Sequence, residues 1–188
     1  MNYHSWSGVV LAGGRSSRMG HDKATIVLEG RTLLQRAIDL LAPHVDELLV
    51  IGDPEKHGDP LAHVLPDERA GLGPLGGIVT ALRNAKHPQV VVIACDMPGL
   101  TGPFIERIQF EMVHGIEAVV PGHDDLIEPL AACYHRTCLS AFEQCIAQGR
   151  LKMSDALEQV RTMIVPIQPG HDGWPEDLFR NINAPGDL

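Results

Sequence analysis

Residues 8–23 read Gly-Val-Val-Leu-Ala-Gly-Gly-Arg-Ser-Ser-Arg-Met-Gly-His-Asp-Lys, and this stretch is the most informative in the chain. A short apolar run bounded by glycines, Val9 to Leu11, predicts a buried β-strand. Glycines at its carboxyl end let backbone N–H groups approach a phosphate, and the cations that follow supply positive charge. Open α/β sheets bind nucleotides in a crevice at the carboxyl ends of their strands. The stretch therefore predicts a strand followed by an anion-binding loop.

The loop matches neither of two common phosphate loops. A Walker A loop has Ser or Thr after its lysine, and none follows Lys23. A dinucleotide-binding loop has a different glycine spacing, because Arg15 directly follows Gly13-Gly14. The plain alternative is a glycine turn with a solvated basic face. The convergence of Arg15, Arg18 and Lys23 on one short loop after a strand favours a phosphate site.

Length and charge limit the classes of protein to consider. The chain has 188 residues, which suits one α/β domain over residues 1–188. A chain of this length buries roughly 70% of its unfolded surface, so it needs no disulfide or metal to fold. The formal net charge of -9 argues against nucleic acid or a membrane surface as a partner. The basic first loop is then a local exception, which strengthens its interpretation as an anion site.

The cysteines carry no sign of a metal site or a disulfide framework. The chain has four of them, and none forms a Cys-x-x-Cys pair. We therefore expect reduced, mostly buried thiols at Cys95, Cys133, Cys138 and Cys145. We expect no signal peptide at the start of the chain, and no apolar run is long enough to span a bilayer. The cytoplasm is the expected location.

Strand and helix patterns alternate along the chain, which predicts a mostly parallel sheet with helices on both faces. A glycine- and proline-rich surface loop is expected at 52–60. A short apolar piece is expected at 25–28. Strands are predicted at 9–11, 47–51, 61–65, 90–94, 117–121, 129–134 and 162–167, and helices at 32–41, 74–85, 103–113, 136–147 and 153–160.

An acidic residue follows the most apolar strand. Asp96, in Cys95-Asp96-Met97-Pro98, comes directly after the strand at 90–94, so its carboxylate points into the crevice. Mg²⁺ on a nucleoside triphosphate prefers hard carboxylate oxygens and commonly uses only one or two of them. The sequence thus predicts Asp96 as the Mg²⁺ ligand. An Asp that caps the next turn is the alternative.

The pattern Leu-Ala-Gly-Gly-x-Ser-x-Arg-Met-Gly-x-Asp-Lys, which begins at Leu11, resembles the signature loop of nucleotidyltransferases. It looks most like that of the molybdenum cofactor guanylyltransferases. The resemblance implies that Leu11, Ala12 and Gly13 contact the guanine nucleotide and that Lys23 holds its phosphates. Cytidylyltransferase relatives usually show Leu-Ala-Ala-Gly and Asp-Gln-Pro. Gly13 and the Cys-Asp-x-Pro form at Asp96 therefore favour guanine.

The same resemblance implies further contacts and a Rossmann-like, three-layer fold with a mixed sheet. Asp67 would touch the nucleotide, as would backbone N–H groups of residues 12–14, which include Gly14. Pro129 would lie on the acceptor side of the pocket. The closing Asn-x-Asn-x-Pro pattern would place Asn181 and Asn183 against a pterin, whose ring edge can exchange hydrogen bonds with amides.

Two departures from the family pattern accompany the match. Many family members have an Asn-rich strand end where this chain has Ile51-Gly52-Asp53, so a nucleotide contact by an Asn side chain is not expected there. The family also usually continues past the Asn motif into a last helix. Here the sequence stops after Asp187-Leu188, and that helix is expected to be absent or truncated.

The resemblance implies a transfer of GMP from GTP to molybdenum-bearing molybdopterin, with release of pyrophosphate. Lys23, with Arg15 or Arg18, would stabilise the triphosphate, and Asp96 would hold the Mg²⁺ cofactor. Cofactor-insertion proteins and apo-molybdoenzymes are the implied recipients. The alternatives are a molybdopterin cytidylyltransferase, a sugar-phosphate nucleotidyltransferase, or a carrier that binds nucleotide or cofactor without turnover.

Overall fold

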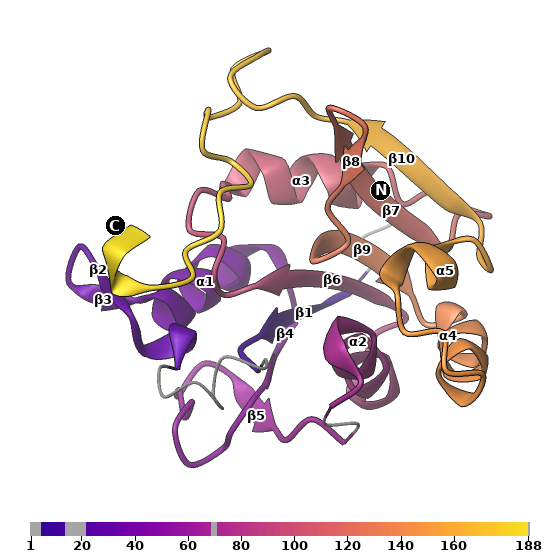
Figure 1. Cartoon of the computed structure of the whole chain (residues 1–188), viewed down its shortest axis with the longest axis horizontal. Coiled ribbons are helices and arrows are strands. Elements are labelled where there is room, and N and C mark those ends of the chain that lie inside the picture. Colours follow the sequence, from indigo (N-terminus) through magenta and orange to yellow (C-terminus); the bar gives the residue numbers. More distant parts are fainter. Residues whose placement is uncertain (1–4, 14–21, 69–70, 188) are drawn as a thin grey trace.

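The sheet at the centre of the molecule fixes where every loop begins. The computed structural model describes residues 5–13, 22–68 and 71–187. In these residues the strands pair in the order β10-β7-β9-β6-β1-β4-β5, and β8 pairs with β7 (Figure 1). The strands are β1 (Trp6–Leu11), β4 (Glu47–Ile51), β5 (His63–Leu65), β6 (Gln89–Ala94), β7 (Ala118–His123), β8 (Leu126–Ile127), β9 (Ala131–His135) and β10 (Thr162–Pro166).

The strand predicted first lies in the middle of this sheet. β1 pairs in parallel with β4 on one side and β6 on the other. Val10 is level with Val50 and with Ile93, so the carboxyl ends of the three strands lie at one edge. The edge of a parallel sheet at which the strands end is where α/β proteins place their ligands.

Two strands, β9 and the short β8, run against the others. β9 is antiparallel to both β6 and β7, while β10 is parallel to β7. β7 therefore runs in the same direction as β6, and its carboxyl end lies at the same edge. The expected α/β class with a mostly parallel, mixed sheet is confirmed, and β9 and β8 make it mixed.

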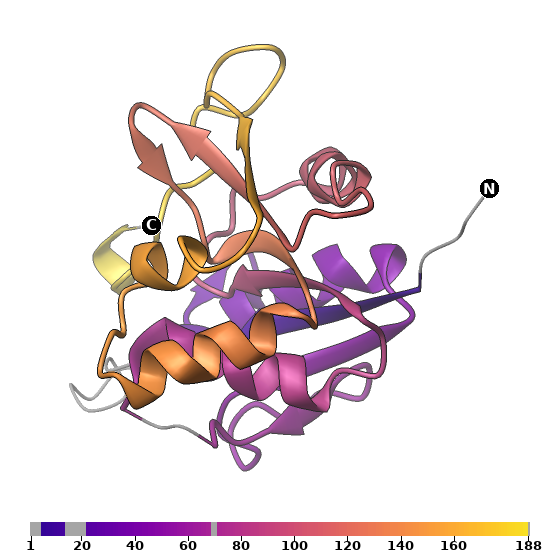
Figure 2. The same cartoon turned by 90° about the vertical axis from the view of Figure 1, so that its right-hand side faces the viewer.

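Helices cover both faces of the sheet and complete three layers (Figures 1 and 2). The side chains of a strand alternate between the two faces. Val10 accordingly packs in the cluster that contains helices α1 and α3, while Val9 packs in the cluster that contains α2, α4 and α5. These helices are α1 (Leu33–Leu41), α2 (Gly73–Asn84), α3 (Gly102–Phe110), α4 (Cys138–Ala147) and α5 (Met153–Leu157).

Local signals explain where the first helix begins. The Thr32 hydroxyl accepts the Gln35 N–H and the Gln35 side chain accepts the Thr32 N–H, each at 3.1 Å. This capping box satisfies two backbone donors that a helix start otherwise leaves free. Within the described part of the chain, no helix is long and apolar enough to cross a membrane.

Element ends differ from the predictions where the backbone tightens. The helices expected at 103–113 and 153–160 end at Phe110 and Leu157. Their apolar periodicity continues, but the N–H groups of Met112 and Gln159 bond three residues back, which ends the α-helical ladder.

The piece at 25–28 divides into a turn, η2 (Lys23–Thr25), and a strand, β2 (Val27–Leu28), which pairs with β3 (Arg31–Thr32). The strand β8 was not predicted.

The buried ring of Phe142 supports the α4 side of the core, and its removal should cost much stability. Phe142 is fully buried and packs edge-on against Tyr134, with ring centroids 5.8 Å apart. We expect Phe142→Ala to lower the free energy of unfolding by about 3–5 kcal/mol, because it leaves a cavity. Phe110→Ala is the matched control, since Phe110 is 77% exposed; it should stay within about 0.5 kcal/mol. Urea unfolding measures both, and equal effects would contradict this account of the core.

The Glu47 carboxylate ties β1 and β4 to the loop after α2, and it should make stability pH-dependent. It accepts hydrogen bonds from the Ser7 hydroxyl at 2.6 Å and the Lys86 N–H at 2.7 Å. Burial raises the pKa of Glu47, but these hydrogen bonds and the Lys86 charge outweigh it and hold the pKa below the usual 4.5.

A carboxyl group with a lowered native pKa stabilises the fold above its unfolded pKa, and this contribution is lost as pH falls through the native pKa. We therefore expect Glu47→Gln to destabilise the protein at pH 7. The difference from wild type should shrink as the pH falls below 4.5. Urea unfolding across this pH range tests it, and a difference that is independent of pH would contradict the assignment.

Candidate functional site

The first loop leaves the sheet at the predicted place. Leu11 and Ala12 are buried at the carboxyl end of β1, and Gly13 is exposed beyond them. The Ala12 N–H donates to the Ile51 carbonyl at 2.9 Å. The Ala12 N–H is one of the backbone donors expected to bind the nucleotide. It is already used in the hydrogen bonding of the sheet. Gly14, Arg15 and Arg18 lie outside the described residues.

Lys23 stands at the centre of the site. Its Nζ donates to Asp96 Oδ2 at 3.1 Å and to Asn183 Oδ1 at 2.5 Å. The Lys23 and Asp96 side chains are 22% and 19% exposed, so the ion pair is shielded but open to a ligand. The structure thus joins three of the predicted residues, from the loop after β1, the end of β6 and the C-terminal segment.

Asp96 keeps one oxygen without a partner. Its Oδ2 faces Lys23, while Oδ1 is buried and has no hydrogen-bond partner among the described residues. An orphaned carboxylate oxygen in a polar site is costly unless a ligand or cation satisfies it. The described residues hold no cluster of three or more metal-ligating side chains. The donor set therefore fits a cation such as Mg²⁺ that takes one protein carboxylate and completes its shell with phosphate and water.

The C-terminal segment is held in place from two sides. Ile182 is 4% exposed and packs with Ile26 and Leu33 in a small apolar cluster. Its N–H donates to the Asp96 carbonyl at 2.8 Å. This anchor delivers Asn183 to Lys23. Asn181 is exposed, and in the described chain no hydrogen bond joins it to Lys23, Asp96 or Asn183.

Beyond Asn183 the chain turns sharply. The Asp187 carboxylate accepts the N–H groups of Asn183 and Ala184 at 2.7 and 2.9 Å. These hydrogen bonds lower the pKa of Asp187. They fix the segment as the turn η4 (Pro185–Asp187) begins. The turn keeps Asn183 oriented toward the site.

Asp67 and Pro129 lie on either side of the central strands. Asp67 follows β5, and its Oδ1 accepts a hydrogen bond from the buried Thr80 hydroxyl of α2 at 3.3 Å. Pro129 precedes β9, and its carbonyl accepts the Tyr134 hydroxyl at 2.6 Å. Both residues are half-buried at the edge where β6 ends. Neither residue is one of the two acceptors, Asp96 and Asn183, to which Lys23 Nζ donates in the described parts of the chain.

His57 is a site residue that the sequence did not reveal. The segment 52–60 was expected to be a surface loop, yet the His57 side chain is only 3% exposed. Its Nε2 lies 2.8 Å from Asp22 Oδ2, and Asp22 directly precedes Lys23. A histidine in a polar, glycine-rich loop carries no periodic signal, so sequence patterns cannot separate it from an exposed one. The available hint is Gly52, whose absent side chain makes room for the imidazole.

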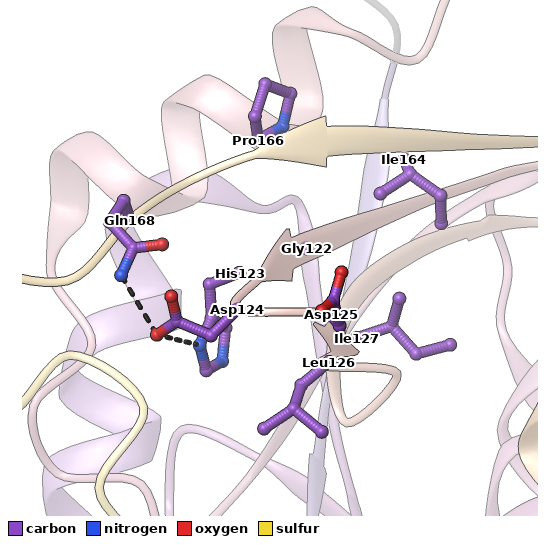
Figure 3. A pocket seen from close by; sticks show the side chains of 9 residues that line it. All are labelled: Gly122, His123, Asp124, Asp125, Leu126, Ile127, Ile164, Pro166 and Gln168. Carbon is purple, nitrogen blue, oxygen red and sulfur yellow. Dashed lines mark hydrogen bonds and ion pairs between the residues drawn. The ribbon is translucent and has the colours of Figure 1, made fainter.

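A separate cavity of about 490 Å³ opens beside the β7–β8 hairpin (Figure 3). Asp124 at the tip of the hairpin accepts a hydrogen bond from Gln168 at 3.0 Å and lies 3.8 Å from the His123 ring. Of the predicted nucleotide and pterin residues that the structure describes, none lines this cavity. The lining residues are Gly122, His123, Asp124, Asp125, Leu126, Ile127, Ile164, Pro166 and Gln168.

The thiols are buried, as expected. All four cysteines are free and buried. Burial, with a smaller effect from Asp96, raises the pKa of Cys95 to about 12. Burial likewise raises the pKa of Cys138 to about 12. At neutral pH both thiols are therefore protonated and unsuited to nucleophilic attack.

Comparison with known proteins shows the family to which the chain belongs. A family model described as "MobA-like NTP transferase domain" matches residues 8–162. A relative from Pelotomaculum thermopropionicum, named "Probable molybdenum cofactor guanylyltransferase", is 36% identical over 97% of this chain and 89% of its own length. A relative of the same name from Chloroflexus aggregans is 32% identical over 97% of this chain and 91% of its own length.

A solved structure agrees with these relatives. The molybdopterin-guanine dinucleotide biosynthesis protein A of Archaeoglobus fulgidus superposes with a TM-score of 0.78 at 28% identity. The match covers 96% of this chain and 94% of that one. The family model matches the chain from the first loop across most of the sheet, and each of the two relatives aligns with 97% of this chain. The chain therefore belongs to the MobA-like NTP transferase family.

Proposed function

We propose that this protein transfers GMP from GTP to molybdenum-bearing molybdopterin and releases pyrophosphate. The observation that carries the proposal is the convergence of Lys23, Asp96 and Asn183 at the carboxyl edge of the sheet. One cation, one carboxylate with a free oxygen and one amide meet there. The names of the relatives supply the substrates: guanylyl transfer to the molybdenum cofactor.

The transfer exchanges one phosphoanhydride bond for another. A terminal phosphate oxygen of molybdopterin attacks the α-phosphorus of GTP. The new P–O–P bond forms as the bond from the α-phosphorus to the β-phosphate oxygen breaks, and pyrophosphate leaves with that electron pair. The acceptor oxygen already carries negative charge, so no strong general base is required. Catalysis then depends on positioning and charge neutralisation.

Lys23 is assigned to the triphosphate. Its ammonium is held between Asp96 and Asn183, and a charge that is already positioned limits the reorganisation needed during the reaction. Leu11, Ala12 and Gly13, with Asp67, would hold the nucleotide along the ends of β1 and β5. The family pattern adds Gly14, Arg15 and Arg18 of the first loop to this set.

Asp96 is assigned to a magnesium ion. Its unpartnered Oδ1 is the atom that would ligate the cation. Bound Mg²⁺ would neutralise charge on the phosphate oxygens of GTP. Oδ2 stays with Lys23, so the one carboxylate would align the metal and the ammonium.

Asn183, Asn181 and Pro129 are assigned to the acceptor side. Asn183 lies next to Lys23, so an acceptor held by its amide would meet the triphosphate there. In the cell, apo-molybdoenzymes and cofactor-insertion proteins of the cytoplasm would receive the product. The protein itself would act as a Mg²⁺-dependent, GTP-binding enzyme.

Removing the Lys23 ammonium should nearly abolish transfer. We expect Lys23→Ala to lower kcat/KM for GTP by about 10²–10³-fold, because a fixed positive charge at the phosphates is lost. Pyrophosphate release under steady-state conditions measures the effect. Lys86→Ala is the control, since Lys86 precedes β6 at the opposite edge of the sheet and its side chain is 78% exposed. Near-normal activity of Lys23→Ala would rule out the assigned role.

Neutralising Asp96 should weaken the binding of the metal while keeping the shape of the side chain nearly constant. We expect Asp96→Asn to raise the Mg²⁺ concentration needed for half-maximal rate and to lower kcat by about 100-fold, because an amide oxygen is a weaker magnesium ligand. Titration of Mg²⁺ at saturating GTP measures both quantities. An unchanged magnesium requirement would remove Asp96 from the metal site.

The choice of substrate is tested by pyrophosphate release with the acceptor and each of GTP and CTP in parallel. Release with GTP alone is the expected result. Release with CTP would make the protein a cytidylyltransferase and remove Gly13 as a sign of base choice. Tight GTP binding without release would favour the carrier alternative.

A further inference from the structure

We propose that His57 is a positioning residue for Lys23, acting through Asp22 and the turn that carries the lysine. This inference rests on the proposed function, because it assigns Lys23 to the triphosphate. His57 itself lies in the loop between β4 and β5 and touches neither Lys23 nor Asp96 through any recorded hydrogen bond of the described chain.

Both nitrogens of the His57 ring are committed. Nδ1 accepts the backbone N–H of Asp53 at 2.9 Å, so Nδ1 carries a lone pair and no proton. Nε2 must then carry the proton, and it donates to Asp22 Oδ2 at 2.8 Å. The two bonds select one neutral tautomer. The imidazole therefore joins the backbone at the end of β4 to the side chain that precedes Lys23.

Asp22 transmits this link to the turn η2. Its Oδ1 accepts the Ala24 N–H at 3.1 Å, and its carbonyl accepts the Thr25 N–H at 3.1 Å. Asp22 is therefore the N-cap of the turn in which Lys23 is the first residue. With Oδ2 held by His57, the carboxylate has a fixed orientation. The start of the Lys23 side chain is fixed with it.

The turn is held on its other side by the apolar cluster of Ile26, Leu33 and Ile182. That cluster restrains the carboxyl side of η2, while His57 restrains its amino side. Between them, Nζ reaches Asp96 and Asn183 at once. Loss of the His57 restraint frees Asp22 and lowers the population of that arrangement.

The backbone packs closely around the His57 ring, and the position of the ring depends on the residue at position 52. A Cβ at position 52 would lie 2.3 Å from His57 Nδ1, so only glycine leaves room for the imidazole. The strand end that departs from the Asn-rich family pattern, Ile51-Gly52-Asp53, thus accommodates and fixes a buried histidine. In this chain the loop between β4 and β5 acts on Lys23 indirectly, through the contact of His57 with Asp22.

Two substitutions separate the positioning role from a merely structural one. In His57→Gln the amide nitrogen reaches the place of Nε2 and keeps a donor for Asp22. In His57→Asn the amide oxygen reaches the place of Nδ1 and keeps an acceptor for the Asp53 N–H, but the donor to Asp22 is lost. We expect His57→Asn to lower kcat/KM for GTP by about tenfold and His57→Gln by no more than about threefold.

Coupling to Asp22 gives the second readout. We expect Asp22→Asn to lower kcat/KM by a similar factor, and His57→Asn to cause little further loss in that background, because both changes break one link. Losses that multiply would overturn the proposal. So would equal losses in His57→Asn and His57→Gln, or normal activity in His57→Asn. His63→Asn is the matched control, since His63 is exposed on the neighbouring strand β5.

A third measurement does not depend on turnover. Hydrogen exchange of the Ala24 and Thr25 amides reports the order of the turn directly. We expect exchange at least tenfold faster in His57→Asn than in wild type, with His57→Gln close to wild type. Unchanged exchange would overturn the positioning role even if the enzyme is active. Faster exchange in a protein whose wild type releases no pyrophosphate would uphold the link and reject the proposed function instead.

Discussion

Parallel pairing on both sides of β1 is the constraint on which the site depends. The ladder continues past the strand ends, because the Ala12 N–H donates to Ile51, and the Cys95 N–H donates to Leu11 at 3.2 Å. The chain therefore leaves the sheet at the same level after β1, β4 and β6. Gly13, Asp53 and Asp96 each lie two residues beyond the end of their strand, at this common level. A one-residue slip in this register would move Asp96 to the other face of the sheet.

A small apolar cluster, separate from the two large core clusters, brings the C-terminal segment to the site. Burying the Ile182 side chain against Ile26 and Leu33 contributes about 1.5–3 kcal/mol. Together with Leu178 and Phe179, which are buried in the main core, it holds a C-terminal segment that has no regular α-helix or strand. The Ile182 N–H then bonds to the Asp96 carbonyl, and Asn183 meets Lys23. Polar residues that are distant in the chain are thus brought together by an apolar neighbour.

The fold could be predicted largely from periodicity, and the site only in part. The run at Val90 to Ala94 and the helical spacing from Leu33 to Leu41 correspond to β6 and α1, since each pattern reflects burial on a regular element. The β8 strand is too short to show a period. His57 is buried in an irregular loop, where burial follows from packing against Gly52 and Asp22 instead of from spacing.

Local patterns of apolar, glycine and charged residues are sufficient to predict the class of the fold and the strand that carries the glycine-rich loop. The same patterns identify Lys23 and Asp96 as candidate residues. The position of Lys23 between Asp96 and Asn183, and the contact of His57 with Asp22, follow from the tertiary structure alone. The physical reason is distance along the chain. Contacts between residues far apart in the sequence arise when the sheet register and the packing of Ile182 bring loops together, and no local pattern encodes that meeting.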